Sequence, residues 1–174
     1  MFTRSSRLQG MAVARSTFLF ADLCDYTAYT WEHGDDSSAE LAVGFHDLVR
    51  LLAAEECCEF VKASGDSVMV RAADCRQAVR LAQRVHTACA ALGYPPIRTG
   101  IDTGPAVPRA GDWWGTTVNT AARVAEAAAP GELWMTERAR AAAADALDVE
   151  IVDCGPRALK GLPACSLHAA LVAV

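Results

Sequence analysis

Apolar residues recur along the chain with two periods, and each change of period marks an expected element boundary. Apolar positions three or four residues apart, as at Leu41, Phe45 and Leu48, are typical of an amphipathic helix. Short apolar runs rich in β-forming residues, such as Thr17–Ala21, predict buried strands. The expected strands are 17–21, 59–62, 66–71, 97–103, 106–109, 132–135, 148–154 and 166–171; the expected helices are 38–56, a segment capped by Asp74 and stopped by Pro95, a segment from Thr117, and an Ala-rich segment after Thr136.

The order of these elements is βαββαββαβαββ, with no internal repeat and no low-complexity linker. This order predicts one α+β domain, and its first portion, βαββαβ, suits a ferredoxin-like core with additional C-terminal αβ elements. Residues 110–115 are expected to form a loop. We expect residues 1–13 to be a flexible leader and residues 14–174 to be the folded domain.

The composition fits a globular domain, since 52% of the 174 residues are hydrophobic, 21% are charged and the formal net charge is −5. This acidic balance argues against a nucleic-acid partner, which needs surplus positive charge. No apolar run approaches the length of a membrane span, so we expect no membrane partner and a cytoplasmic location. The seven cysteines form no C-x-x-C pair, which argues against structural zinc and favours buried thiols in a reducing compartment.

Two aspartates follow apolar segments in positions suited to chemistry. Asp22 ends the first expected strand, and Asp66 follows Gly65 at the turn of the 59–71 hairpin. A carboxylate beside an apolar strand is costly unless something compensates it, and Mg²⁺ held by two such carboxylates would compensate both. The other interpretation is that both are ordinary turn residues, because aspartate is common in turns.

Further polar residues stand out by type or spacing. Lys62 is one of only two lysines among 16 basic residues and lies on the hairpin arm opposite Asp66. Asn119 and Arg123 are four residues apart, which places them on one face of the third expected helix. Asp112 lies beside two tryptophans in a loop, which suggests an interface or a pocket wall. The alternative for Asn119 and Arg123 is that they belong to an ordinary helix surface. The alternative for the two tryptophans is that they form a hydrophobic plug over the sheet. The four histidines have unrelated spacings and are expected to be packed or solvated rather than catalytic.

Three segments together resemble the catalytic domain of class III nucleotidyl cyclases of the bacterial adenylyl cyclase type. They are residues 19–27 (LFADLCDYT), 62–69 (KASGDSVM) and 111–124 (GDWWGTTVNTAARV). Each alone is a weak signal, but their order and separations also fit, and the resemblance extends over about residues 14–172. It implies a head-to-tail homodimer with sites shared between the two chains.

The resemblance also implies a role for each matched position. Asp22 and Asp66, with the backbone carbonyl of Leu23, would hold two Mg²⁺ or Mn²⁺ ions per site. Backbone N–H groups at the start of the first helix would cradle the triphosphate, as helix N-termini do for anions; they belong to Leu23, Cys24, Asp25, Tyr26 and Thr27. The remaining roles are purine reading by Lys62 and Asp112, ribose orientation by Asn119, stabilisation of the transferring phosphate by Arg123, and contact with the terminal phosphates by Lys160.

The two residues expected to read the purine favour ATP. Adenine offers an acceptor at N1 and a donor at its amino group, whereas lysine only donates and aspartate only accepts. Lys62 and Asp112 therefore suit adenine, and the expected reaction converts ATP to 3′,5′-cyclic AMP and pyrophosphate. The alternatives are a guanylyl or mixed-specificity cyclase, a catalytically silent nucleotide-binding regulatory module, and an interaction domain that uses the tryptophan loop as its contact surface.

Overall fold

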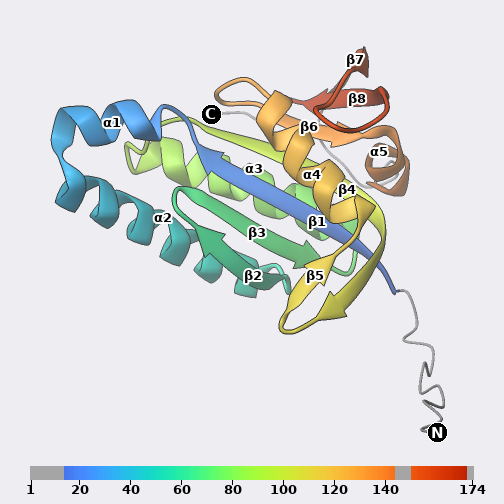
Figure 1. The fold of residues 1–174 in the computed structure, drawn as a ribbon, viewed down its shortest axis with the longest axis horizontal. Helices are drawn as coiled ribbons and strands as arrows, with labels where there is room; N and C mark the ends of the chain where they lie inside the picture. Colours follow the sequence, from blue (N-terminus) through green and yellow to red (C-terminus); the bar gives the residue numbers. More distant parts are fainter. Residues whose placement is uncertain (1–13, 144–149, 172–174) are drawn as a thin grey trace, which may run out of the picture.

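The computed structural model describes residues 14–143 and 150–171. The expected leader at 1–13 and the first residues of the strand expected at 148–154 lie outside the described residues. The described chain forms five helices and an eight-stranded sheet (Figure 1). The elements are β1 (Ala14–Leu23), α1 (Tyr26–His33), α2 (Asp35–Glu55), β2 (Glu59–Ser64), β3 (Ser67–Ala72), α3 (Cys75–Ala91), β4 (Ile97–Arg109), β5 (Asp112–Trp114), α4 (Thr116–Ala127), β6 (Leu133–Thr136), α5 (Glu137–Ala143), β7 (Ile151–Arg157) and β8 (Cys165–Ala170).

The strands follow the order β2-β3-β1-β4-β6-β8-β7, and β5 pairs with β4 beside this path. The β2-β3-β1-β4 portion is antiparallel throughout, which is the order of a ferredoxin-like βαββαβ core. β6 joins β4 in parallel, and β8 and β7 extend the sheet with antiparallel pairing. The α+β class and the ferredoxin-like core with C-terminal additions are therefore confirmed.

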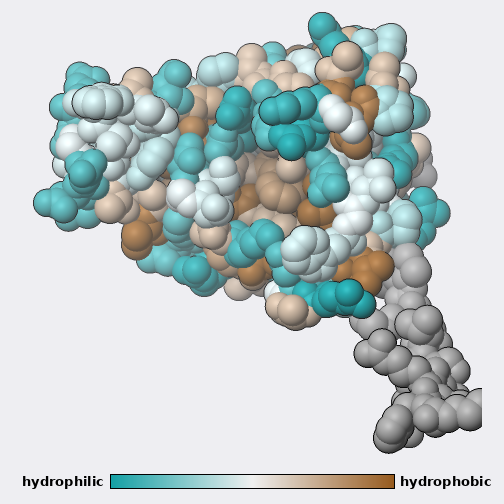
Figure 2. Space-filling model, viewed as in Figure 1, coloured by the Kyte–Doolittle hydropathy of each residue, from teal (hydrophilic) through white to brown (hydrophobic). Residues whose placement is uncertain are grey.

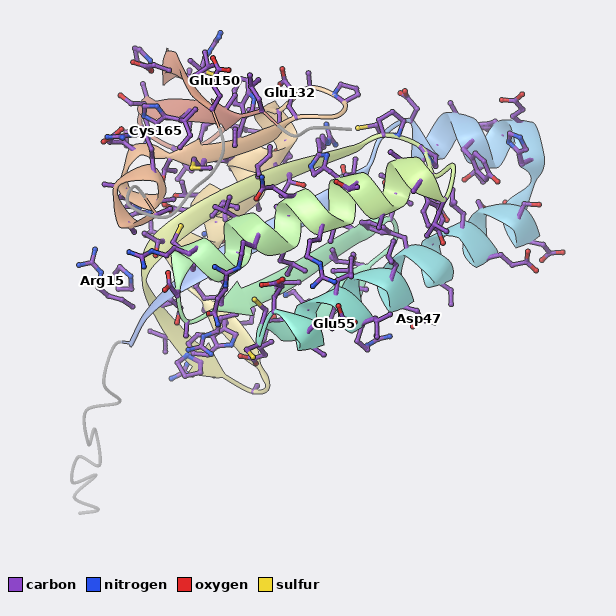
Figure 3. The ribbon with its side chains drawn as sticks, turned by 180° about the vertical axis from the view of Figure 1, so that it is seen from behind. Arg15, Asp47, Glu55, Glu132, Glu150 and Cys165 are labelled. Atoms are coloured by element: carbon purple, nitrogen blue, oxygen red, sulfur yellow. The ribbon has the colours of Figure 1, made fainter. Side chains whose placement is uncertain are left out.

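Helices cover both faces of the sheet. α2 and α3 lie together on one face, as the view from behind shows (Figure 3). They contribute to the larger hydrophobic cluster, with Phe45 from α2 and Leu81 from α3 fully buried. α4 lies on the opposite face, where Val118 shares a second cluster with Phe18 of β1 and Met69 of β3. The core of the domain is therefore divided by the sheet into two layers.

A glycine sets how closely α4 approaches the sheet. A Cβ atom on Gly100 of β4 would lie 2.1 Å from the backbone nitrogen of Ala125 and 2.5 Å from the backbone oxygen of Ala121. Both are backbone atoms of α4, so a side chain at this position would displace the helix. Because α4 also carries Asn119 and Arg123, Gly100 determines how close to the sheet these two candidate site residues lie.

One helix was not expected from the hydrophobic pattern. α1 has no buried residues, so its sequence lacks the apolar stripe that marks an amphipathic helix. α2 then begins at Asp35, earlier than the start expected near Ser38, and its N-cap is Gly34 rather than a serine. None of the helices in the described ranges is long and apolar enough to cross a membrane.

Two expectations around β4 were wrong. The strands expected at 97–103 and 106–109 form one strand, β4, and the expected loop at 110–115 contains β5, which folds back on β4 as a hairpin. Within the described chain, β6 pairs with β4 only at residues 99–101. One edge of β4 is therefore free of a partner strand near Pro105, where a residue without an N–H is tolerated.

Candidate active site

Asp22 lies on the central strand β1, and both neighbouring strands hold its carboxylate. The register places Asp22 opposite Ser67 of β3 and opposite Arg98 of β4. The Ser67 hydroxyl donates to Asp22 Oδ1. Arg98 donates to Asp22 Oδ2 from Nε at 2.9 Å and from Nη2 at 2.5 Å. The Asp22 carboxylate is therefore held from both sides, and Arg98 compensates its charge.

Asp66 lies in the turn between β2 and β3 and lines the same cavity as Asp22, with a volume of about 520 Å³. Burial and the negative charge of Asp22 raise the pKa of Asp66. A divalent cation would stabilise both ionised carboxylates, and carboxylate and carbonyl oxygens are ligands that Mg²⁺ and Mn²⁺ accept. The donor set therefore fits the expected metal. The other lining residues are Leu23, Asp25, Tyr26, Thr27, Ala28, Trp31 and Arg98.

The backbone between β1 and α1 supplies N–H groups to this cavity, but two of the five expected donors are already bonded. The Leu23 N–H donates to the Asp66 carbonyl at 3.2 Å, and the Cys24 N–H donates to the Pro96 carbonyl at 2.8 Å. Asp25 is the N-cap of α1 and has a left-handed conformation with φ of 57°. The N–H groups that a helix leaves without an internal acceptor begin at Tyr26. The first turn of α1 is therefore the better anion-binding segment.

The structure brings Lys62 of β2 and Asp112 of β5 into contact. Lys62 Nζ donates to Asp112 Oδ2 at 2.5 Å, and the Trp113 N–H donates to Asp112 Oδ1 at 2.8 Å. The Lys62 ammonium and the Trp113 N–H hold the pKa of Asp112 below its usual value. An ammonium and a carboxylate side by side present one donor and one acceptor to a flat polar ligand.

Asn119 and Arg123 lie on α4 and line a second cavity of about 330 Å³, together with Lys160 from the β7–β8 connection. Arg123 Nη1 also pairs with Glu126 at 2.5 Å. On the side of the molecule that carries α4, hydrophilic side chains border a hollow with an apolar floor (Figure 2). The other lining residues of the second cavity are Ala122, Glu126, Gly161 and Leu162.

The expected side chains thus fall into three groups on one chain. Asp22 and Asp66 line the first cavity, Asn119, Arg123 and Lys160 line the second, and no described residue lines both. Lys62 and Asp112 pair with each other outside these two linings. Arg98 was not among the expected site residues, although it is the only charged residue in the segment 97–101 of the expected strand. Its role becomes visible only from the register of β1 and β4, which places Arg98 opposite Asp22.

The cavity with Asp22 and Asp66 beside a helix N-terminus and the separate cavity with Asn119, Arg123 and Lys160 both lie on one α+β domain with a ferredoxin-like core. Over residues 10–169 the chain matches the family model of the adenylate and guanylate cyclase catalytic domain, and it belongs to that family.

The chain is 33% identical over 153 residues to the pH-sensitive adenylate cyclase MT1302 of Mycobacterium tuberculosis, which is 84% of this chain and 38% of that protein. An adenylate cyclase of Streptomyces griseus is 34% identical over 115 residues, covering 66% of this chain and 29% of that protein. The chain thus spans less than half the length of these relatives.

Solved structures share the fold. The adenylyl cyclase CyaB from P. aeruginosa superposes with a TM-score of 0.82 at 20% identity, covering 92% of this chain and 95% of that one. The guanylate cyclase domain of RhGC from Catenaria anguillulae in complex with GTP superposes with a TM-score of 0.80 at 18% identity, covering 92% of this chain and 97% of that one. At these identities the likeness shows the fold alone.

Proposed function

We propose that this domain is an adenylyl cyclase that converts ATP to 3′,5′-cyclic AMP and pyrophosphate. The ribose 3′-oxygen forms a bond to the α-phosphorus, and the bond from that phosphorus to the oxygen bridging to the β-phosphate breaks. The electron pair of the broken bond leaves with pyrophosphate, and the proton of the 3′-hydroxyl passes to solvent. The contact between Lys62 and Asp112 is the observation that carries the choice of ATP.

Lys62 and Asp112 select the base in this proposal. Lys62 donates to adenine N1, and Asp112 accepts from the 6-amino group, so both polar groups find partners. Guanine offers a protonated N1 and a carbonyl oxygen at the corresponding positions, which leaves Lys62 opposite a donor. A site that leaves its own polar groups unpaired with the wrong ligand discriminates strongly against it.

The second group of residues acts on the ribose and the phosphates. Asn119 hydrogen-bonds and orients the ribose, so that the 3′-oxygen lies in line with the leaving pyrophosphate. Arg123 donates N–H groups to the charge that develops on the transferring phosphate, and Lys160 contacts the terminal phosphates. Glu126 holds Arg123 until substrate arrives, since both line the same cavity.

Asp22 and Asp66, with the Leu23 carbonyl, would hold two Mg²⁺ or Mn²⁺ ions. When bound, such ions lower the pKa of the 3′-hydroxyl and neutralise charge on the phosphates. The chain's own contribution is to fix these oxygens on the β1 strand and the β2–β3 turn. The first turn of α1 adds backbone N–H groups that bind the phosphates.

The separation of the two cavities supports a site shared between two chains. The acidic cavity of one chain would face the Asn119 and Arg123 cavity of its partner, and the reverse contact would form a second identical site. Such a head-to-tail pair has two-fold symmetry, as most homodimers do.

The test is cyclic nucleotide formation by the purified protein, with ATP or GTP and with Mg²⁺, Mn²⁺ or EDTA. The proposal expects metal-dependent cyclic AMP from ATP and little cyclic GMP from GTP. Asp66→Asn is the matched variant, because it keeps the size of the side chain and removes the charge. Equal or greater cyclic GMP would show a guanylyl or mixed-specificity cyclase. Nucleotide binding with no product from either substrate would refute the proposal and favour a silent regulatory module.

A further inference from the structure

Asp112 lies on a hairpin that has little of its own to hold it in place. β5 contains three residues, and its three pairs with β4 are all the sheet pairing it has among the described residues. The ion pair between Lys62 and Asp112 is partly exposed, with Lys62 at 48% side-chain exposure, and exposed ion pairs stabilise structure only weakly. Another contact must therefore hold the Asp112 carboxylate in register with Lys62.

Trp113, the next residue on β5, supplies such a contact. The Arg71 guanidinium lies over the Trp113 ring, 4.5 Å from the ring centroid. The Phe18 ring packs against the same indole at a centroid distance of 5.8 Å and an interplanar angle of 57°. Trp113 Nε1 also donates to Glu59 Oε1 at 3.5 Å. The indole of Trp113 is thereby tied to strands β1, β2 and β3.

Arg71 is itself held by two side chains on neighbouring strands. Arg71 Nε donates to Ser16 Oγ at 2.9 Å, and Arg71 Nη1 pairs with Glu59 at 3.2 Å. The guanidinium therefore lies over the indole in one orientation, and one ring face is covered by a cation. This arrangement fits a support inside the protein better than a stacking surface for a base.

We propose that Trp113 and Arg71 are positioning residues, which hold the Asp112 carboxylate beside Lys62 and thereby set the preference for adenine over guanine. The inference rests on the proposed function for its effect on selectivity. Trp113 acts on Asp112 in two ways. Its backbone N–H donates to Asp112 Oδ1, and its anchored side chain fixes the strand on which Asp112 lies.

The test compares Trp113→Leu with Trp114→Leu. Trp114 lies on the same short strand, but it is 57% exposed, so its replacement leaves the contacts with Arg71 and Phe18 intact. For Trp113→Leu we expect the ratio of kcat/KM for ATP to that for GTP to fall by about 5- to 10-fold. KM for ATP rises while kcat changes little, because a base contact contributes equally to ground-state and transition-state binding. Trp114→Leu should keep the wild-type ratio.

Arg71 has its own matched pair of variants. Arg71→Met removes the cation and should lower the selectivity ratio, whereas Arg71→Lys keeps the charge but not the planar guanidinium and should restore only part of it. Arg50→Met is the control for loss of a cation over a ring, since Arg50 lies 4.5 Å from the centroid of Phe60, which packs against a different hydrophobic cluster from Trp113. A selectivity ratio that falls as much in Arg50→Met as in Arg71→Met would overturn the proposal.

A second measurement separates this inference from the proposed function. The pKa of Asp112, followed by ¹³C NMR of its carboxyl carbon, needs no catalysis. Trp113→Leu changes no charge, so a rise of the Asp112 pKa toward its ordinary value would report a loosened contact with Lys62. If the wild-type protein forms no cyclic nucleotide, the proposed function fails, and this titration still decides the positioning role. An equal pKa in Trp113→Leu, Trp114→Leu and wild type refutes that role.

Discussion

At the scale of single residues, the carboxylate expected to hold metal is already engaged. Asp22 accepts from Ser67 and from Arg98, which both lie on strands adjacent to β1. A cation that binds Asp22 must therefore share the carboxylate with Arg98 or displace it. The arrangement holds the Asp22 carboxylate in one orientation before any ligand arrives, which lowers the entropy that binding must overcome.

The charge at position 62 should control which purine is accepted. Lys62→Glu replaces a donor by an acceptor, so we expect kcat/KM for ATP to fall about 10- to 100-fold and the relative rate with GTP to rise. Lys62→Met should lower the ATP value without any gain for GTP. Competition between the two nucleotides in one reaction measures the ratio directly. A wild-type ratio in both variants would show that Lys62 does not contact the base.

Acid should destabilise the fold through a histidine that the site does not use. Burial lowers the pKa of His86 to about 4, and its Nε2 lies 3.0 Å from Thr99 Oγ1. The unfolded chain takes up a proton near pH 6.5, whereas the folded chain resists it until about pH 4. The free energy of unfolding therefore falls as pH drops through this window, by roughly 3 kcal/mol in total, and is unaffected above it.

Urea unfolding at pH 7.5 and at pH 5 measures this effect. His86→Gln removes the titrating group and should flatten the pH dependence, although it weakens the protein at both values. His33→Gln is the control, because His33 is exposed on α1. A pH dependence in His86→Gln as steep as that of wild type would contradict the assignment to His86.

Individual site residues were predicted from the sequence where the residue type was itself informative. A rare lysine and a loop aspartate suggested Lys62 and Asp112, and the structure places them in contact. Arg98 was missed because a single arginine in a strand has no period and no motif. The occupied N–H groups of Leu23 and Cys24 were also missed, because their acceptors, Asp66 and Pro96, lie far along the chain.

At the scale of elements, the packing of α4 on β4 depends on a missing side chain. Gly100→Ala would place a methyl group against the backbone of α4, so we expect a loss of about 1–3 kcal/mol in stability together with lower activity. Gly44→Ala is the matched control, because its new methyl group meets only the movable end of the Tyr94 side chain. Urea midpoints of the two variants make the comparison. Equal midpoints would show that α4 is free to shift.

Elements marked by an apolar period or by a turn or cap signal were predicted well, and elements without such a signal were not. The hairpin of β2 and β3 and the Asp74 cap of α3 were both expected, and Asp74 accepts from the Arg76 N–H at 2.9 Å. α1 has no buried residues, and β5 is only three residues long, so neither segment shows a detectable periodicity of apolar positions. The continuity of β4 through Pro105 depends on its neighbours, which local sequence does not reveal.

At the scale of the whole molecule, the shared-site proposal predicts complementation between two inactive chains. Asp22→Ala damages the acidic half of a site, and Arg123→Ala damages the other half, each with a loss of about 10²- to 10³-fold or more. In a dimer of one Asp22→Ala chain and one Arg123→Ala chain, both substitutions fall in the same site, and the second site is intact. Random pairing should then restore about a quarter of the wild-type activity.

The control is a mixture of Asp22→Ala and Asp66→Ala chains. Both lesions lie in the same half, so every site in a mixed dimer carries one of them and the mixture should stay inactive. Cyclic nucleotide formation after mixing and re-equilibration is the measurement. Activity no higher than that of either parent in the Asp22→Ala and Arg123→Ala mixture would rule out a site built from two chains.

The exposed indole on α1 can serve as an intrinsic fluorescent reporter of the acidic cavity. Trp31 is 88% exposed and lines the cavity with Asp22 and Asp66. A ligand that fills this cavity displaces water from the ring, which shifts the emission of Trp31 and shields it from iodide quenching. Trp31→Phe removes that contribution and leaves the other three tryptophans as background. Occupancy of the site can therefore be followed in unlabelled protein by its own fluorescence, before any chemistry takes place.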